Sequence, residues 1–184
     1  MNEDTLKWIK HFDDKFLAGS PEGIHFSCPK NYNRLNVLQE GDKCYEGFCL
    51  GIVFSWNGGH GWRTSCISKG KKYKPLLENG MKLINSYDPK FECTTIQFNK
   101  NYKVKKHIDG NNVGESYIIG LGNYSGGELI VYNEQDQPTY IDINHKFYKF
   151  NGSKYYHETA DFIGERMTLV FFKLGGINKS LKKT

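Results

Sequence analysis

The 184-residue sequence contains no apolar run approaching the roughly 20 residues that a membrane-spanning helix requires. Its first ten residues, MNEDTLKWIK, lack the basic start and the apolar stretch of a secretory signal. We therefore expect a soluble intracellular protein, nuclear or cytoplasmic, that does not contact a membrane.

The chain also lacks any pattern of paired cysteines. There are five, an odd number, and no two of them form a CxxC pair. Neither a disulfide framework nor a thiolate zinc site is indicated, and a reducing compartment fits this pattern best. The five are Cys28, Cys44, Cys49, Cys66 and Cys93.

Proline is rare, with five residues against 20 glycines, whereas tyrosine and phenylalanine number twelve each. Such a composition is typical of aromatic-rich extended segments joined by tight turns, and it argues against a long helical bundle. The length fits one domain, and the hydrophobic fraction of 38% is enough for a core. The formal net charge of +5 permits an anionic partner without demanding one.

Two segments of the first half are predicted to be helical. Apolar residues recur at helical spacing over 4–17, with Asp4 as the expected N-cap, and again over 74–86. Between them, apolar stretches such as 48–56 indicate buried strands separated by glycine turns.

The second half changes to short extended segments punctuated by glycine, asparagine and aspartate. At this spacing, eight strands indicate a jelly roll, a mainly β fold with flanking helices. We expect a β core over 93–174, helices, strands and substrate loops over 1–92, and a basic tail over 175–184. The expected strands are 93–99, 103–109, 115–121, 127–132, 138–142, 146–150, 154–158 and 166–173.

The strongest local signal is His107-Ile108-Asp109 at the end of an expected strand. Period-two alternation would place His107 and Asp109 on one face, close enough to hold one ion. His157, on a late expected strand, can supply a third ligand. Two imidazoles and one carboxylate form a facial triad that leaves positions open, as non-haem Fe(II) requires; zinc could use the same ligands.

Arg166 opens the last expected strand and favours iron over zinc. Alternation places Arg166 and Thr168 on one face of that strand, while Leu169 and Phe171 point the other way. A guanidinium and a hydroxyl that face the metal can bind a carboxylate. A ketoacid co-substrate is implied.

The order of these residues resembles that of the Fe(II)/2-oxoglutarate-dependent dioxygenases. The resemblance covers roughly residues 93–174 and implies the double-stranded β-helix, a cupin-like jelly roll, as the fold. Its carriers are HID (107–109), GGEL (126–129), FNG (150–152), His157 and GERMTLVFF (164–172).

This resemblance also assigns roles to individual residues. It implies that His107, Asp109 and His157 bind Fe(II), and that Arg166, with Thr168, binds the C5 carboxylate of 2-oxoglutarate. Tyr102 is a candidate contact of the same co-substrate, with ordinary packing as the alternative. Asn99 and Tyr117 are further candidates of that kind.

The implied reaction uses dioxygen and converts 2-oxoglutarate to succinate and CO2 while a substrate C–H bond is hydroxylated. Ascorbate is expected as a reductant, and the protein is expected to act as a monomer.

Within this superfamily, residues 107–129 are most similar to the TET/JBP branch, which oxidises the methyl group of 5-methylcytosine or thymine in nucleic acids. This implies a nucleic-acid partner, DNA rather than RNA. Aromatic residues could then stack on a base flipped from the duplex. The candidates are Trp56, Trp62, Tyr124 and Phe162.

Two basic clusters could contact phosphates or could simply be solvated surface. One precedes the expected iron ligands and the other precedes the second expected helix. They comprise Lys100, Lys103, Lys105 and Lys106, and Lys69, Lys71, Lys72 and Lys74.

Two alternatives remain open on the sequence. A prolyl or lysyl hydroxylase would share the triad, although such enzymes commonly anchor 2-oxoglutarate with lysine rather than with an arginine such as Arg166. A non-catalytic β-sandwich binding module would hold the histidines incidentally or around a structural zinc.

Overall fold

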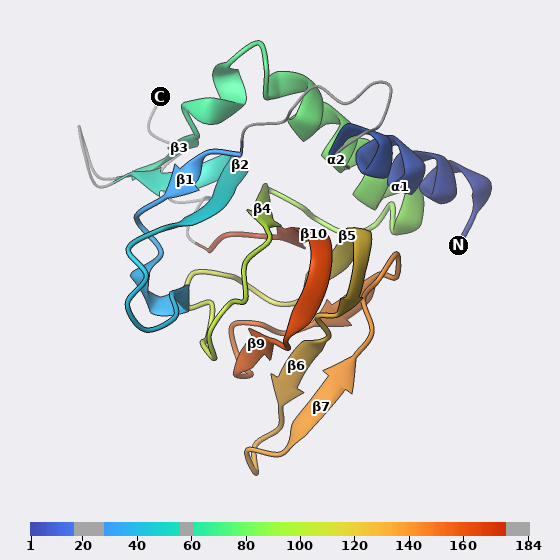
Figure 1. Ribbon diagram of the computed structural model, residues 1–184. Coiled ribbons are helices and arrows are strands. Elements are labelled where there is room, and N and C mark those ends of the chain that lie inside the picture. The colour runs from blue at the N-terminus through green and yellow to red at the C-terminus, as the bar shows by residue number, and fades with distance from the viewer. Residues whose placement is uncertain (17–27, 56–60, 176–184) are drawn as a thin grey trace.

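A computed structural model describes residues 1–16, 28–55 and 61–175 of the chain (Figure 1). The helices are α1 (Glu3–Phe16) and α2 (Lys74–Tyr87), with short 3-10 turns at Leu35–Val37 and Ile67–Lys69. No helix in the described ranges is long and apolar enough to span a membrane. The strands are β1 (Lys30–Asn31), β2 (Tyr45–Ser55), β3 (Gly61–Thr64), β4 (Thr95–Lys100), β5 (Ser116–Gly126), β6 (Leu129–Tyr132), β7 (Pro138–Ile141), β8 (Tyr148–Phe150), β9 (His157–Thr159) and β10 (Phe162–Phe172).

The strands form two sheets, as expected for a double-stranded β-helix. The larger runs in the order β1-β2-β4-β10-β5-β8, with β3 also paired to β2, and the smaller in the order β7-β6-β9. Apolar side chains of both sheets meet between them in one cluster, which joins Ile118 of β5 and Val170 of β10 to Leu129 of β6. This confirms the mainly β fold with flanking helices.

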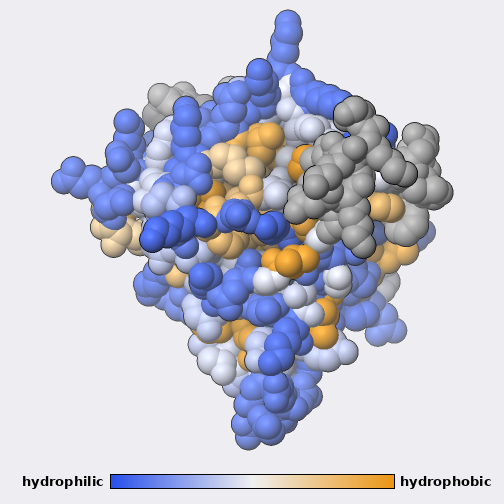
Figure 2. Space-filling model, turned by 180° about the vertical axis from the view of Figure 1, so that it is seen from behind, coloured by the Kyte–Doolittle hydropathy of each residue, from blue (hydrophilic) through white to orange (hydrophobic). Residues whose placement is uncertain are grey.

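The two helices lie side by side over the outer face of the larger sheet (Figure 1). Phe12 of α1 and Leu83 of α2 are fully buried in the same cluster as Phe98, Leu169 and Phe171 of that sheet. The alternation expected along the last strand is therefore confirmed, because Leu169 and Phe171 face the helices. The surface seen from behind is mostly hydrophilic, with apolar residues in limited patches (Figure 2).

Both helices match their predicted ranges to within a residue or two, but the predicted cap of the first is wrong. The Asn2 side chain accepts a hydrogen bond from the Thr5 backbone amide at 2.8 Å, so Asn2 caps α1. Asp4 lies inside the first turn, where its negative charge interacts favourably with the positive end of the helix dipole.

The predicted strand over 103–109 is also wrong. Residues 101–115 are irregular apart from short bridges, one of which pairs His107 with His157. The backbone leaves the strand at Asn101, which has a left-handed φ of 47°. Asn101 then holds β10, since its side chain accepts a hydrogen bond from the Arg166 amide at 2.7 Å.

Strands β5 and β10 are longer than predicted, and Arg166 lies inside β10 instead of opening it. They pair from Phe162 opposite Gly126 to Phe171 opposite Tyr117. Gly164 has φ 109°, and a Cβ there would lie 2.3 Å from the Asn123 carbonyl oxygen, so only glycine fits. Such glycines resemble turn signals in the sequence, but here they lie inside paired strands.

Candidate active site

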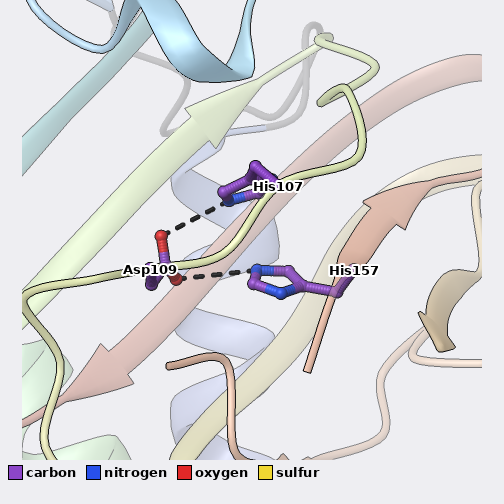
Figure 3. A group of neighbouring side chains, drawn as sticks. All are labelled: His107, Asp109 and His157. Carbon is purple, nitrogen blue, oxygen red and sulfur yellow. Dashed lines mark ion pairs between the residues drawn. The ribbon is translucent and has the colours of Figure 1, made fainter. Parts of the chain in front are cut away.

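Three side chains from two segments converge in the cavity between the sheets (Figure 3). The Nε2 atom of His107 lies 3.3 Å from Oδ1 of Asp109, and Nε2 of His157 lies 3.6 Å from Oδ2. One ligand atom from each residue falls within 4.8 Å of the others. The predicted triad is therefore assembled in space.

The proximity of the two histidines comes from the backbone and not from strand alternation. His107 and His157 exchange reciprocal amide-to-carbonyl hydrogen bonds of 3.0 Å, which hold their ring centroids 4.2 Å apart. Asp109 is fixed separately, because its amide donates to the Gly152 carbonyl at 2.9 Å. A Cβ on Gly152 would lie 3.2 Å from the His157 ring, so this turn passes directly beside the triad.

The imidazoles present the correct atoms to a metal ion. Nδ1 of His107 lies 2.8 Å from the Lys105 carbonyl, and Nδ1 of His157 lies 3.1 Å from the Tyr155 carbonyl. Because a carbonyl only accepts, each Nδ1 carries the hydrogen and each Nε2 keeps its lone pair. Two imidazole nitrogens and a carboxylate, with each imidazole oriented by a backbone carbonyl, fit Fe(II).

Asp109 is held as a carboxylate. Burial raises its pKa, but the adjacent side chains of His107 and His157 and the charge of Arg34 outweigh burial and bring the pKa well below its ordinary value. Arg34 donates from Nη2 to Oδ1 of Asp109 at 2.7 Å. Arg34 could not be found from the sequence, since no motif links it to a residue 75 positions away.

Arg166 forms a second buried polar feature on the same cavity. The residue is 3% exposed, and Nη2 donates to the Gly127 carbonyl at 2.9 Å. Within the described residues Nε has no hydrogen-bond partner, and burial lowers the pKa of Arg166. A buried cation with an unpaired donor fits a carboxylate ligand, as predicted for the co-substrate.

Thr168 lies beside Arg166 on the cavity side of β10, as alternation predicted. Its hydroxyl accepts a hydrogen bond from the Asn99 amide at 3.1 Å, so its own hydrogen is free to donate. Asn99 also lines the cavity. Both are buried, and the arrangement is suited to holding an anion next to the guanidinium.

The structure places Tyr102 away from the cavity. Its hydroxyl accepts from the Gln39 amide at 2.7 Å and donates to Asp42 at 2.9 Å, while its ring stacks on Tyr45. Tyr117 faces the helix side, where its hydroxyl donates to Asp88 at 3.0 Å. Both tyrosines therefore have packing and hydrogen-bonding roles outside the cavity, which is the alternative considered for Tyr102.

The aromatic residues expected to stack on a base lie in different parts of the structure. Trp62 lines the cavity, whereas Tyr124 and Phe162 lie against Arg166, their ring centroids 5.5 and 5.4 Å from its guanidinium carbon. Trp56 and the tail over 176–184 lie outside the described residues.

Two lysines of the first basic cluster form ion pairs with acidic side chains. Lys103 pairs with Asp161 at 2.7 Å and Lys106 with Asp136 at 2.5 Å. These contacts match the interpretation of this cluster as solvated surface.

No protein family and no curated protein matches the sequence. Among solved structures, NgTET1 in complex with 5mC DNA is similar with a TM-score of 0.53 and 15% identity, over 74% of this chain and 67% of that chain. An oxidoreductase of the 2OG-Fe(II) oxygenase family from Burkholderia pseudomallei gives a TM-score of 0.51 and 16% identity, over 79% and 73%. The chain therefore has the fold of the 2OG-Fe(II) oxygenases, with a His-Asp-His triad inside it.

Proposed function

We propose that this protein is an Fe(II)- and 2-oxoglutarate-dependent dioxygenase that hydroxylates a substrate C–H bond. One observation carries the proposal: the triad His107, Asp109 and His157 opens on the same cavity as the buried guanidinium of Arg166, whose Nε is unpaired among the described residues. A structural zinc site would need no such guanidinium, and it would close its coordination with a fourth protein ligand.

Each part of the site has a separate task. The triad would hold Fe(II), and its three ligands would leave coordination positions for the co-substrate and dioxygen. Arg166, fixed by the Gly127 carbonyl, binds the distal carboxylate of 2-oxoglutarate, and Thr168 donates a further hydrogen bond. When bound, Fe(II) supplies the redox chemistry that couples decarboxylation of 2-oxoglutarate to substrate oxidation.

The proposed substrate is a methylated pyrimidine, 5-methylcytosine or thymine, in nucleic acid, with DNA preferred to RNA. Residues 107–129 carry the TET/JBP resemblance, and NgTET1, which has a similar fold, was solved with 5mC DNA. The cavity, of about 890 Å³, is large enough for a base beside the co-substrate. A base reaches such a cavity only after leaving the stack.

The decisive experiment supplies purified protein with Fe(II), 2-oxoglutarate, ascorbate and air. DNA and RNA containing 5-methylcytosine or thymine, and a peptide library, are then analysed by mass spectrometry. We expect oxidised methyl groups in DNA, matched by succinate, and neither product with Asp109→Ala. Oxidised peptides alone would identify a protein hydroxylase, and the absence of succinate with every substrate would support the binding module.

A further inference from the structure

The cavity has an excess of positive charge among the described residues that line it. The described lining residues include two carboxylates, Asp109 and Glu158, and four cations. Asp109 is paired with Arg34, and Glu158 accepts a hydrogen bond from the Tyr132 hydroxyl. The four cations are Lys30, Arg34, Arg63 and Arg166.

Two of these cations have no task in the proposed chemistry. Arg34 binds Asp109, and Arg166 is assigned to the co-substrate. Lys30 and Arg63 are both exposed, and neither forms an ion pair within the described part of the chain. A divalent ion and a dicarboxylate would cancel each other in charge, so these two side chains would still lack a counter-charge.

An aromatic pair lies next to Arg63. Phe54 of β2 and Trp62 of β3 are directly opposite in the ladder, with ring centroids 5.1 Å apart in an edge-on arrangement. Both line the cavity and are only partly buried. Lys30 lies on β1, which pairs with the other end of β2, and Figure 1 shows these three strands together at the end of the larger sheet.

Amide side chains complete this part of the wall. They can donate to phosphate oxygens and to base edges without adding charge. Those from the segment around β1 are Asn31, Asn33 and Asn36.

We propose that the rim formed by Lys30, Phe54, Trp62 and Arg63 is a nucleic-acid-binding surface. Lys30 and Arg63 contact backbone phosphates, and the aromatic pair stacks on a base at the cavity mouth. Cations interleaved with aromatic rings are the combination that binds single-stranded or flipped nucleotides. This inference rests on the proposed function of the same site and specifies how its substrate is held.

The charge of the cavity also argues against a lysyl substrate. A lysine side chain would bring a further cation into a site whose four cations already outnumber its two carboxylates. A nucleic acid, being a polyanion, is attracted by the same positive potential, which also speeds its association with the protein.

The experiment measures binding of a fluorescent oligonucleotide containing 5-methylcytosine, single-stranded and duplex, by anisotropy over a series of NaCl concentrations. The protein is loaded with Mn(II). The test variant is Lys30→Met with Arg63→Met. The control, Lys7→Met with Lys90→Met, changes the charge equally at two exposed lysines that do not line the cavity.

We expect the rim variant to bind about tenfold more weakly or worse, and the slope of log affinity against log salt to fall by about 2, one for each lost phosphate contact. Trp62→Ala should weaken binding by about tenfold without changing the slope. The control should bind as the wild type does. Circular dichroism checks that each variant is folded.

Equal losses in the rim and control variants would overturn the inference, since they would show a general effect of charge. Wild-type protein that consumes 2-oxoglutarate but binds no oligonucleotide would also overturn it, while leaving the dioxygenase proposal intact. Wild-type protein that neither binds Mn(II) nor consumes 2-oxoglutarate would instead overturn the proposed function.

Discussion

Arg34 and Asp109 form an ion pair inside the cavity, with 2.7 Å between Nη2 and Oδ1, although they lie 75 positions apart in the sequence. Arg34 belongs to the segment before the first 3-10 turn, and Asp109 to the irregular segment that follows β4. Their side chains are 29% and 14% exposed, so water screens the pair only in part. The N-terminal half of the chain thus supplies the counter-charge of a candidate metal ligand.

Arg34→Met should destabilise the metal-free protein more than the metal-bound protein. Removing Arg34 leaves a partly buried carboxylate without its counter-charge, which costs about 1–3 kcal/mol because water still reaches both groups. A divalent ion neutralises the same carboxylate, so the rise in Tm on adding Mn(II) should be larger in the variant. Thermal denaturation with and without Mn(II) measures both quantities.

The matched control for this prediction is Arg63→Met, which removes a cavity-lining cation that forms no ion pair among the described residues. It should leave the Mn(II)-induced rise in Tm close to that of the wild type. A rise that is equal in Arg34→Met and the wild type would contradict the prediction.

Replacement of a triad residue should remove metal binding while the fold is retained. His107→Ala or Asp109→Ala is expected to weaken Mn(II) binding by at least about 100-fold, more than the loss of a supporting residue would. The two-sheet core does not depend on these side chains, because its clusters are apolar. Isothermal titration measures the affinity and circular dichroism the fold. Removal of metal from the wild type with EDTA should abolish 2-oxoglutarate turnover, and its return on adding Fe(II) is the control.

Arg166→Met should raise the Kd for 2-oxoglutarate by about 10- to 100-fold, because it removes a charge-assisted hydrogen bond to the distal carboxylate. Quenching of intrinsic fluorescence in the Mn(II)-loaded protein is a suitable measurement. Mn(II) affinity in the absence of co-substrate should change much less, and an equal loss of both affinities would argue against the assigned role.

Gly127→Ala should also weaken 2-oxoglutarate binding. A Cβ at Gly127 would lie 2.8 Å from Nε and 2.9 Å from Cδ of Arg166, so the guanidinium would have to move. Gly114→Ala is the matched control, because Gly114 has nearly the same φ, 72° against 71°, and open space around its Cβ. Both variants carry similar backbone strain, so the difference in Kd isolates the contact with Arg166. Equal Kd values would show that this contact is unimportant.

The cysteines should differ in their rates of alkylation. Burial raises the pKa of Cys28 and of Cys93 to about 12, which leaves roughly one molecule in ten thousand as thiolate at pH 8. Cys66 is exposed. At pH 8 iodoacetamide should therefore modify Cys66 first, with Cys28 and Cys93 modified only after denaturation, as followed by peptide mass spectrometry. Early modification of Cys28 in folded protein would contradict this.

Local sequence patterns were sufficient for several elements. Both helix ranges followed from apolar spacing, and alternation along β10 correctly separated Arg166 and Thr168, which line the cavity, from Leu169 and Phe171, which face the helices. Such periodicities depend only on the geometry of the nearby backbone.

Contacts between distant segments could not be predicted in that way. The HxD segment is not a strand, and the triad is closed instead by the reciprocal bridge between His107 and His157. Tyr102 turns toward Gln39 and Asp42, and not toward the cavity.

The sequence by itself was enough to predict the β-rich fold and the triad and to propose Arg166 as the carboxylate anchor, because the order and spacing of those residues carry the signal. Only the tertiary structure decided that Arg34 pairs with Asp109 and that Lys30, Phe54, Trp62 and Arg63 line the same cavity. The physical reason is that these residues become neighbours through chain folding, and no local period in the sequence records which distant segments will meet.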